Sequence, residues 1–154
     1  MAADISWISE KLGVGGGIWN EQNMIDVVRR GVTHVINMQI EFDDRPLAEP
    51  YGVKVLWNAI DDDFQPKGPE IFQRGVDFAN EAWQDPESRL FVHCAAGVHR
   101  APMMTLALLR SQGMELQDAL DRISTLRPEA DWPEVYVKSV EEWVKTAKLA
   151  ASKR

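Results

Sequence analysis

The chain has 154 residues, of which 45% are hydrophobic and 27% charged, and its net charge is −7 at pH 7. This length and composition predict one globular domain over residues 1–154, which can bury roughly two thirds of its unfolded surface. The acidic balance argues against nucleic acid and anionic membranes as partners, because both bind basic surfaces. No apolar run approaches the roughly 18 residues of a membrane span, and residues 1–4 lack a leader pattern, so we expect a cytoplasmic protein.

The first third of the chain alternates between strand and helix signals. Residues 5–18 predict one or two short strands with a turn at the glycines of residues 15–17. Asn20 is a suitable N-cap for a helix that ends at Gly31. The β-branched and apolar residues 33–38 predict a buried strand. Acidic residues and two prolines over residues 41–50 predict a loop.

The rest of the chain is richer in helix signals. We expect a strand at residues 53–57, a helix that opens at Gly68 and Pro69, a strand at 90–92, a buried helix from 101 to Gly113, a helix at 116–123, and a last helix from Pro133 before a basic tail at 148–154. This order predicts an α/β fold: a single domain with a central, mostly parallel sheet and helices on both faces.

The stretch His-Cys-Ala-Ala-Gly-Val-His-Arg at residues 93–100 joins a predicted strand to the buried helix. Backbone N–H groups of such a loop, with those of the helix's first turn, converge on one point and bind an anion. Cys94 is the only cysteine, which excludes an intrachain disulfide and a cysteine-rich zinc site. The expected phosphate-binding residues are Ala95, Ala96, Gly97, Val98, His99 and Arg100.

A helix N-terminus and a nearby cation favour the thiolate form of a cysteine, which is the nucleophilic form. Arg100 can hold two phosphate oxygens in a bidentate fork. The pattern therefore predicts that Cys94 attacks a phosphorus atom while Arg100 holds the phosphoryl group. We expect no metal and no cofactor, and nothing in the pattern specifies an oligomeric state.

The pattern His-Cys-x-x-Gly-x-x-Arg resembles the signature loop of the cysteine-dependent protein tyrosine phosphatases, and the short chain resembles their dual-specificity branch. The resemblance implies a protein-tyrosine-phosphatase-like fold and a phosphomonoesterase that acts on phosphotyrosine, and on phosphoserine and phosphothreonine, through a phosphocysteine intermediate. A phosphorylated protein or peptide would be its substrate. In that family the histidine before the cysteine supports the loop's backbone, which is the role implied for His93.

A second catalytic group is needed, because protonating the leaving oxygen contributes about 10² to 10⁴ in rate. In the resembled family it is an aspartate on a loop before the helix that precedes the nucleophile strand. Here that loop carries Asp61, Asp62 and Asp63. The family's Ile/Val-x-Asp pattern favours Asp62, which lies 32 residues before Cys94. The other two aspartates stay open as the acid, and the cluster can also be a solvated turn or a weak divalent-cation site.

One position departs from the resembled pattern. The family usually has Ser or Thr after the arginine, where the hydroxyl helps to expel the thiolate, and this chain has Ala101. We therefore expect slow breakdown of the phosphocysteine, with a burst of product from a good leaving group.

Other functions fit part of the pattern. The Arg-Ala-Pro continuation also resembles plant glucan phosphatases, and some of the six tryptophans could stack on sugars, although Trp57, Trp83 and Trp143 fall at predicted core positions. A weakly active module that binds phosphorylated ligands is a second alternative. Persulfide or arsenate chemistry is a third, but it would not need the acidic loop.

Overall fold

The computed structural model describes residues 2–152. In this part of the chain, strands β1 (Ile5–Ser9), β2 (Leu12–Gly15), β3 (His34–Gln39), β4 (Lys54–Ile60) and β5 (Leu90–His93) form one sheet in the order β1-β2-β5-β3-β4. β1 pairs antiparallel with β2, and the other neighbours pair in parallel. The predicted α/β fold with a mostly parallel sheet is confirmed.

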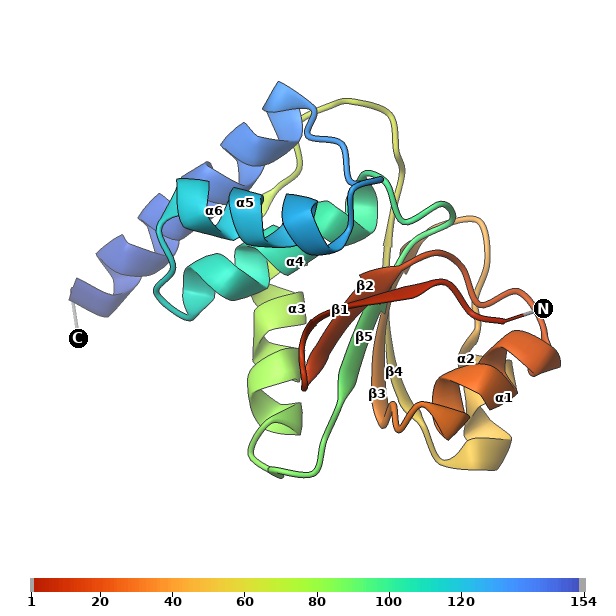
Figure 1. Cartoon of the computed structure of the whole chain (residues 1–154). Helices are drawn as coiled ribbons and strands as arrows, with labels where there is room; N and C mark the ends of the chain where they lie inside the picture. The colour runs from red at the N-terminus through yellow and green to blue at the C-terminus, as the bar shows by residue number, and fades with distance from the viewer. Residues whose placement is uncertain (1, 153–154) are drawn as a thin grey trace.

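Helices cover both faces of this sheet (Figure 1). On one face lie α1 (Glu21–Arg29) and the short α2 (Arg45–Ala48), with a 3₁₀ turn at Glu49–Tyr51. On the other lie α3 (Pro69–Ala82), α4 (Arg100–Ser111), α5 (Leu116–Leu126) and α6 (Glu134–Ser152). Each face has its own apolar core. The central strand β5 is buried along its whole length, as expected of a strand covered on both sides.

α4 is the central helix, and every residue from Arg100 to Leu109 is buried. It packs against β2, β3 and β5 on one side and against α3, α5 and α6 on the other. Burying a side chain such as Leu106 or Leu108 contributes about 1.5–3 kcal/mol. The N-terminus of α4, where the loop after β5 ends, is therefore held in a fixed position.

Several predicted helix boundaries are confirmed. Asn20 caps α1, because its side-chain oxygen accepts a hydrogen bond of 2.9 Å from the N–H of Asn23. Pro69 stands in the first turn of α3, where its missing N–H costs nothing. The predicted basic tail at 148–154 is helical to the end of α6 at Ser152, and residues 153 and 154 lie outside the described part of the chain. Among residues 2–152, none of the helices has the length and hydropathy needed to cross a bilayer.

Two local predictions were wrong. Residues 41–50 are not all loop, because α2 and the 3₁₀ turn that follows it lie within or overlap this range. Each begins with a proline in its first turn, a position that tolerates proline although the interior of a helix does not. The glycines at 15–17 are not the turn between the first two strands, which lies at Glu10 and Lys11.

Candidate active site

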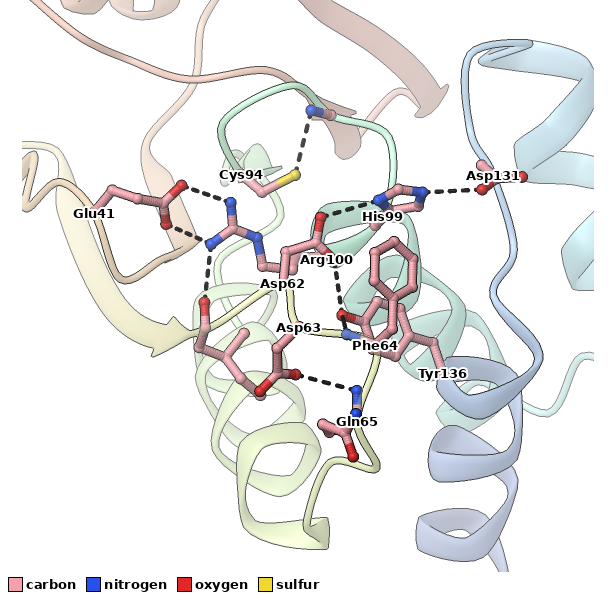
Figure 2. Close-up of polar contacts among 12 residues, drawn as sticks. Glu41, Asp62, Asp63, Phe64, Gln65, Cys94, His99, Arg100, Asp131 and Tyr136 are labelled. Atoms are coloured by element: carbon pink, nitrogen blue, oxygen red, sulfur yellow. Dashed lines mark hydrogen bonds and ion pairs between the residues drawn. The ribbon is translucent and has the colours of Figure 1, made fainter.

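The loop between β5 and α4 places Cys94 at the carboxyl end of the central strand. The thiol is buried, with 2% of the residue exposed. The N–H of Gly97 points at the sulfur, with 3.3 Å between Gly97 N and Cys94 Sγ (Figure 2). This is the strand-loop-helix arrangement that the sequence predicts, at the edge of the sheet where ligands of α/β folds bind.

Position 97 requires a glycine for two separate reasons. Its φ of 71° lies in the left-handed region that disfavours a side chain. A Cβ atom there would also collide with the guanidinium of Arg127 and the backbone of Gly15. The glycine therefore lets the loop turn tightly while neighbouring chain packs directly behind it.

Arg100 begins α4 and its guanidinium is held by a carboxylate that the sequence analysis missed. Nη1 and Nη2 donate to the two carboxylate oxygens of Glu41, at 2.5 and 2.8 Å, and Nη1 also donates to the carbonyl of Ile60 at 2.9 Å (Figure 2). The hydrogen bonds from Arg100 lower the pKa of Glu41 to about 2. The Nε atom of Arg100 is buried and has no hydrogen-bond partner among the described residues.

Of the three candidate acids, the structure brings Asp62 to the loop. Its Oδ2 lies 3.0 Å from Nδ1 of His99, and its Oδ1 accepts a hydrogen bond of 2.7 Å from the hydroxyl of Tyr136. Asp63 turns the other way, to the N–H of Gln65 (Figure 2). It also pairs with the ammonium of Lys67. Asp61 is exposed. Because Asp62 and Asp63 point to different surroundings, the three aspartates do not converge on one ligand.

Tyr136 supports the acidic loop from α6. Its hydroxyl accepts from the N–H of Phe64 at 3.1 Å while it donates to Asp62. Burial, followed by the hydrogen bond to Asp62, raises the pKa of Tyr136 to about 12. The hydroxyl therefore remains a proton donor at neutral pH. Among residues 2–152, no group of three His, Cys, Asp or Glu side chains is placed to hold a metal ion.

His93 forms a buried pair with Asp44, another residue missed in the sequence analysis. Nε2 of His93 lies 2.6 Å from Oδ2 of Asp44, and both side chains are fully buried. Asn37 donates to the other carboxylate oxygen of Asp44 at 3.1 Å. The root of the loop is thereby tied to the segment that begins α2.

Arg127, at the end of α5, holds the outer side of the loop. Its Nε donates to the carbonyl of Gly97 at 2.7 Å, and its terminal nitrogens donate to the carboxylate of Asp4 at 2.9 and 2.7 Å. The N–H of Gly17 donates to the carbonyl of Ala95 at 3.0 Å. The loop carbonyls are satisfied from behind, which leaves the N–H groups to face a ligand. The sequence signal for this role of Arg127 is its position directly before Pro128, at the end of an amphipathic helix.

The sequence similarities agree with this geometry. No family model matches the chain. Protein tyrosine phosphatase type IVA 3 of Bos taurus is 32% identical over 103 residues, which are 66% of this chain and 59% of that protein. Dual specificity protein phosphatase 26 of Bos taurus is 31% identical over 108 residues, 68% of this chain and 51% of that protein. The matched region thus spans between half and two thirds of these relatives.

Solved structures share the fold. The crystal structure of PTPMT1 has a TM-score of 0.83 at 22% identity, and covers 97% of this chain and 99% of that one. The crystal structure of a single-residue variant of human DUSP28 has a TM-score of 0.78 at 18% identity, and covers 96% of this chain and 98% of that one. The chain belongs to the cysteine-dependent protein tyrosine phosphatase superfamily. Within it, the chain groups with the dual-specificity branch.

Proposed function

We propose that residues 1–154 form a phosphatase domain that hydrolyses phosphotyrosine, and also phosphoserine and phosphothreonine, in proteins or peptides. The observation that carries this proposal is the pairing of Cys94 with Arg100. A buried thiol faces a loop N–H, and the adjacent guanidinium has a buried Nε–H without a partner among residues 2–152. A buried donor without a partner costs about 1–3 kcal/mol, and an oxygen of a bound phosphoryl group would satisfy it.

The proposed reaction has two steps. The thiolate of Cys94 attacks phosphorus, so that an S–P bond forms while the ester P–O bond breaks, and Asp62 gives its proton to the leaving oxygen. Water then attacks the phosphocysteine, Asp62 takes a proton from that water, and Cys94 leaves as a thiolate. Arg100 and the loop N–H groups from Ala95 to His99 stabilise the transferring group in both steps.

Glu41 has a positioning role in this proposal. Its carboxylate accepts hydrogen bonds from both terminal nitrogens of Arg100. These hydrogen bonds orient the guanidinium so that its Nε–H can donate to a phosphate oxygen. His93 acts in a similar way through its buried pair with Asp44, because fixing the imidazole also fixes the backbone at Cys94.

The aromatic side chains at the mouth favour an aromatic leaving group. Phe64 is 52% exposed and lies parallel to Tyr136, with ring centroids 5.9 Å apart. Its other neighbour is the ring of His99, edge-on at 5.2 Å. Phe64 has a φ of 57°, which is unusual for a bulky residue and is associated with functional sites. An exposed ring beside the acid can contact the ring of phosphotyrosine, so we rank this substrate first.

The alternative substrates have weaker support. For a glucan phosphatase, several exposed tryptophans would be expected. Trp19 is exposed, but the other five tryptophans are buried or partly buried. A PTPMT1 structure was solved in complex with PI(5)P, but the loop of this chain has no lysine to meet additional phosphates. A binding module without turnover is the remaining alternative, and Ala101 is the residue that favours it.

The test is turnover of phosphotyrosine, phosphoserine and phosphothreonine peptides, phosphoglucan and PI(5)P, compared by kcat/KM. We expect the highest value for phosphotyrosine peptides. Cys94→Ser should lose about 10³-fold or more in kcat and still bind the phosphopeptide, whereas Arg100→Lys should lose binding as well. Binding by the unaltered protein without turnover of any substrate would refute the enzymatic proposal and leave the binding module.

A further inference from the structure

His99 lies where three segments of the chain meet at the mouth of the loop. Its Nδ1 is 3.0 Å from Oδ2 of Asp62 on the acidic loop, and its Nε2 is 2.9 Å from Oδ2 of Asp131 on the segment between α5 and α6 (Figure 2). The rings of Phe64 and Tyr136 are both in T-shaped arrangements with the imidazole, with centroid distances of 5.2 and 6.5 Å. His99 therefore connects the phosphate loop with the candidate acid and with a distant segment.

Both ring nitrogens of His99 face carboxylates, which fixes its protonation. While both carboxylates are ionised, a neutral imidazole, which has one N–H, could donate to only one of them, whereas an imidazolium donates to both. When Asp62 carries the proton that it gives to the leaving oxygen, its Oδ2 can still accept from the Nδ1–H of His99. Burial opposes the charge, but the hydrogen bonds to Asp62 and Asp131 outweigh it and raise the pKa of His99. The surrounding segments carry further titratable or charged groups: Cys94, Arg100, Asp61, Asp63, Lys67, Arg127, Glu129, Glu134 and Tyr136.

Asp131 is a fixed anchor although its side chain is 69% exposed. Its N–H donates to the carbonyl of Val98 at 2.9 Å, and the N–H of Ala130 donates to the carbonyl of Arg127. Arg127 in turn holds Gly97. The carboxylate that receives Nε2 of His99 is thus attached by its own backbone to the loop that carries His99.

We propose that His99 is a positioning residue for the general acid: as an imidazolium held by Asp131, it sets where the carboxyl group of Asp62 stands over the leaving oxygen. The inference rests on the proposed function, in which Asp62 protonates that oxygen. Asp62 is on a loop, and its Oδ2 contact is with His99. Displacing a catalytic group by about 1 Å can reduce the rate about 10²-fold, so losing this link should impair the acid step in particular.

The leaving group separates this role from a general structural one. A poor leaving group such as unsubstituted phenol needs the acid's proton, whereas an activated nitrophenol leaves without it. We expect Asp131→Asn to reduce kcat/KM for phenyl phosphate about 10- to 100-fold, and to leave that for nitrophenyl phosphate within about threefold. His99→Gln should reduce the value for phenyl phosphate by at least as much, and by more than the value for nitrophenyl phosphate. Glu134→Gln is the matched control, because it removes an exposed carboxylate near Asp131 whose ion pair is with Lys138.

Two further measurements decide the assignment. In an Asp62→Asn background, adding His99→Gln should cause no additional loss with phenyl phosphate, because the group it positions is already gone. The NMR titration of His99 should have its midpoint above 6.5, and Asp131→Asn should lower that midpoint. Equal losses with both leaving groups, additive losses in the double variant, or an unchanged midpoint would each overturn the inference.

The proposed phosphatase function is tested separately from the role of His99. If the unaltered protein turns over neither aryl phosphate, or keeps its turnover in Cys94→Ser, the phosphatase proposal is wrong. The midpoint measurement then still reports whether Asp131 and Asp62 hold His99 as an imidazolium.

Discussion

Asp62 and Asp63 are adjacent in the chain, yet their carboxylates have different surroundings. Asp62 meets His99 and Tyr136 beside the loop, whereas Asp63 pairs with Lys67. A carboxyl group that faces the loop can reach a leaving oxygen, and one that is turned toward the ammonium of Lys67 cannot. The geometry therefore favours Asp62 as the proposed acid, as the Ile/Val-x-Asp pattern does.

We predict that Asp62→Asn reduces kcat/KM about 10²- to 10⁴-fold with an unactivated ester, while Asp63→Asn stays near the unaltered protein. The two variants remove the same charge from neighbouring positions, so each is the control for the other. A pH series of kcat/KM gives a second readout, since only loss of the acid should remove the alkaline limb of the profile. A larger loss in Asp63→Asn would reassign the acid.

At the scale of the element, the loop depends on chain that packs behind it. Gly97 and Gly113 both have a positive φ, 71° and 96°. Around Gly113 a Cβ atom would meet nothing within 4 Å, whereas at Gly97 it would meet Arg127 and Gly15. A side chain would therefore strain the backbone at both positions, but at Gly97 it would also collide with neighbouring atoms.

We predict that Gly113→Ala costs about 1–2 kcal/mol of unfolding free energy and leaves kcat/KM unchanged. Gly97→Ala should cost more, and should also reduce kcat/KM about 10²-fold, because the loop's N–H groups shift away from the phosphoryl oxygens. Denaturant unfolding and steady-state kinetics measure the two effects. Normal activity in Gly97→Ala would mean that the loop adapts without moving its donors.

At the scale of the whole molecule, stability should depend on pH through groups with shifted pKa values. Arg127 lowers the pKa of Asp4, and Arg100 lowers that of Glu41 to about 2. Because these two pKa values are lowered by folding, the ionised carboxylates stabilise the folded protein at pH values above about 4. This stabilisation is lost as the pH falls through the pKa values of the folded protein. The pKa of His99 is raised, so its contribution is present below 6.5 and is lost as the pH rises through its folded value.

His34 affects the pH dependence of stability in the opposite direction. Burial lowers its pKa, so its contribution to stability is lost as the pH falls. The Tm of the unaltered protein alone would mix the two histidines. We predict that the Tm difference between the unaltered protein and His99→Asn is largest just below pH 6.5 and shrinks as the pH rises. A difference that is constant from pH 5 to 9 would contradict the imidazolium assignment.

Features that depend on residues close together in the chain could be predicted from the sequence. Strand and helix periodicity, the cap at Asn20 and the proline at the start of α3 predicted most elements, and the spacing from Cys94 to Arg100 predicted the loop. The prediction failed at residues 41–50, where prolines that begin a helix were interpreted as breaks. Local steric and hydrogen-bonding preferences explain both outcomes.

The distant side chains that complete the site could not be predicted in this way, because the fold brings them together. Glu41 meets Arg100 across 59 positions, Asp44 meets His93 across 49, and Asp4 meets Arg127 across 123. The contacts that favour Asp62 over Asp63 as the proposed acid are of the same kind, because His99 and Tyr136 supply them. A charged side chain takes its partner from whatever the packed sheet and helices bring within about 3 Å, and no local pattern in the chain encodes that distance.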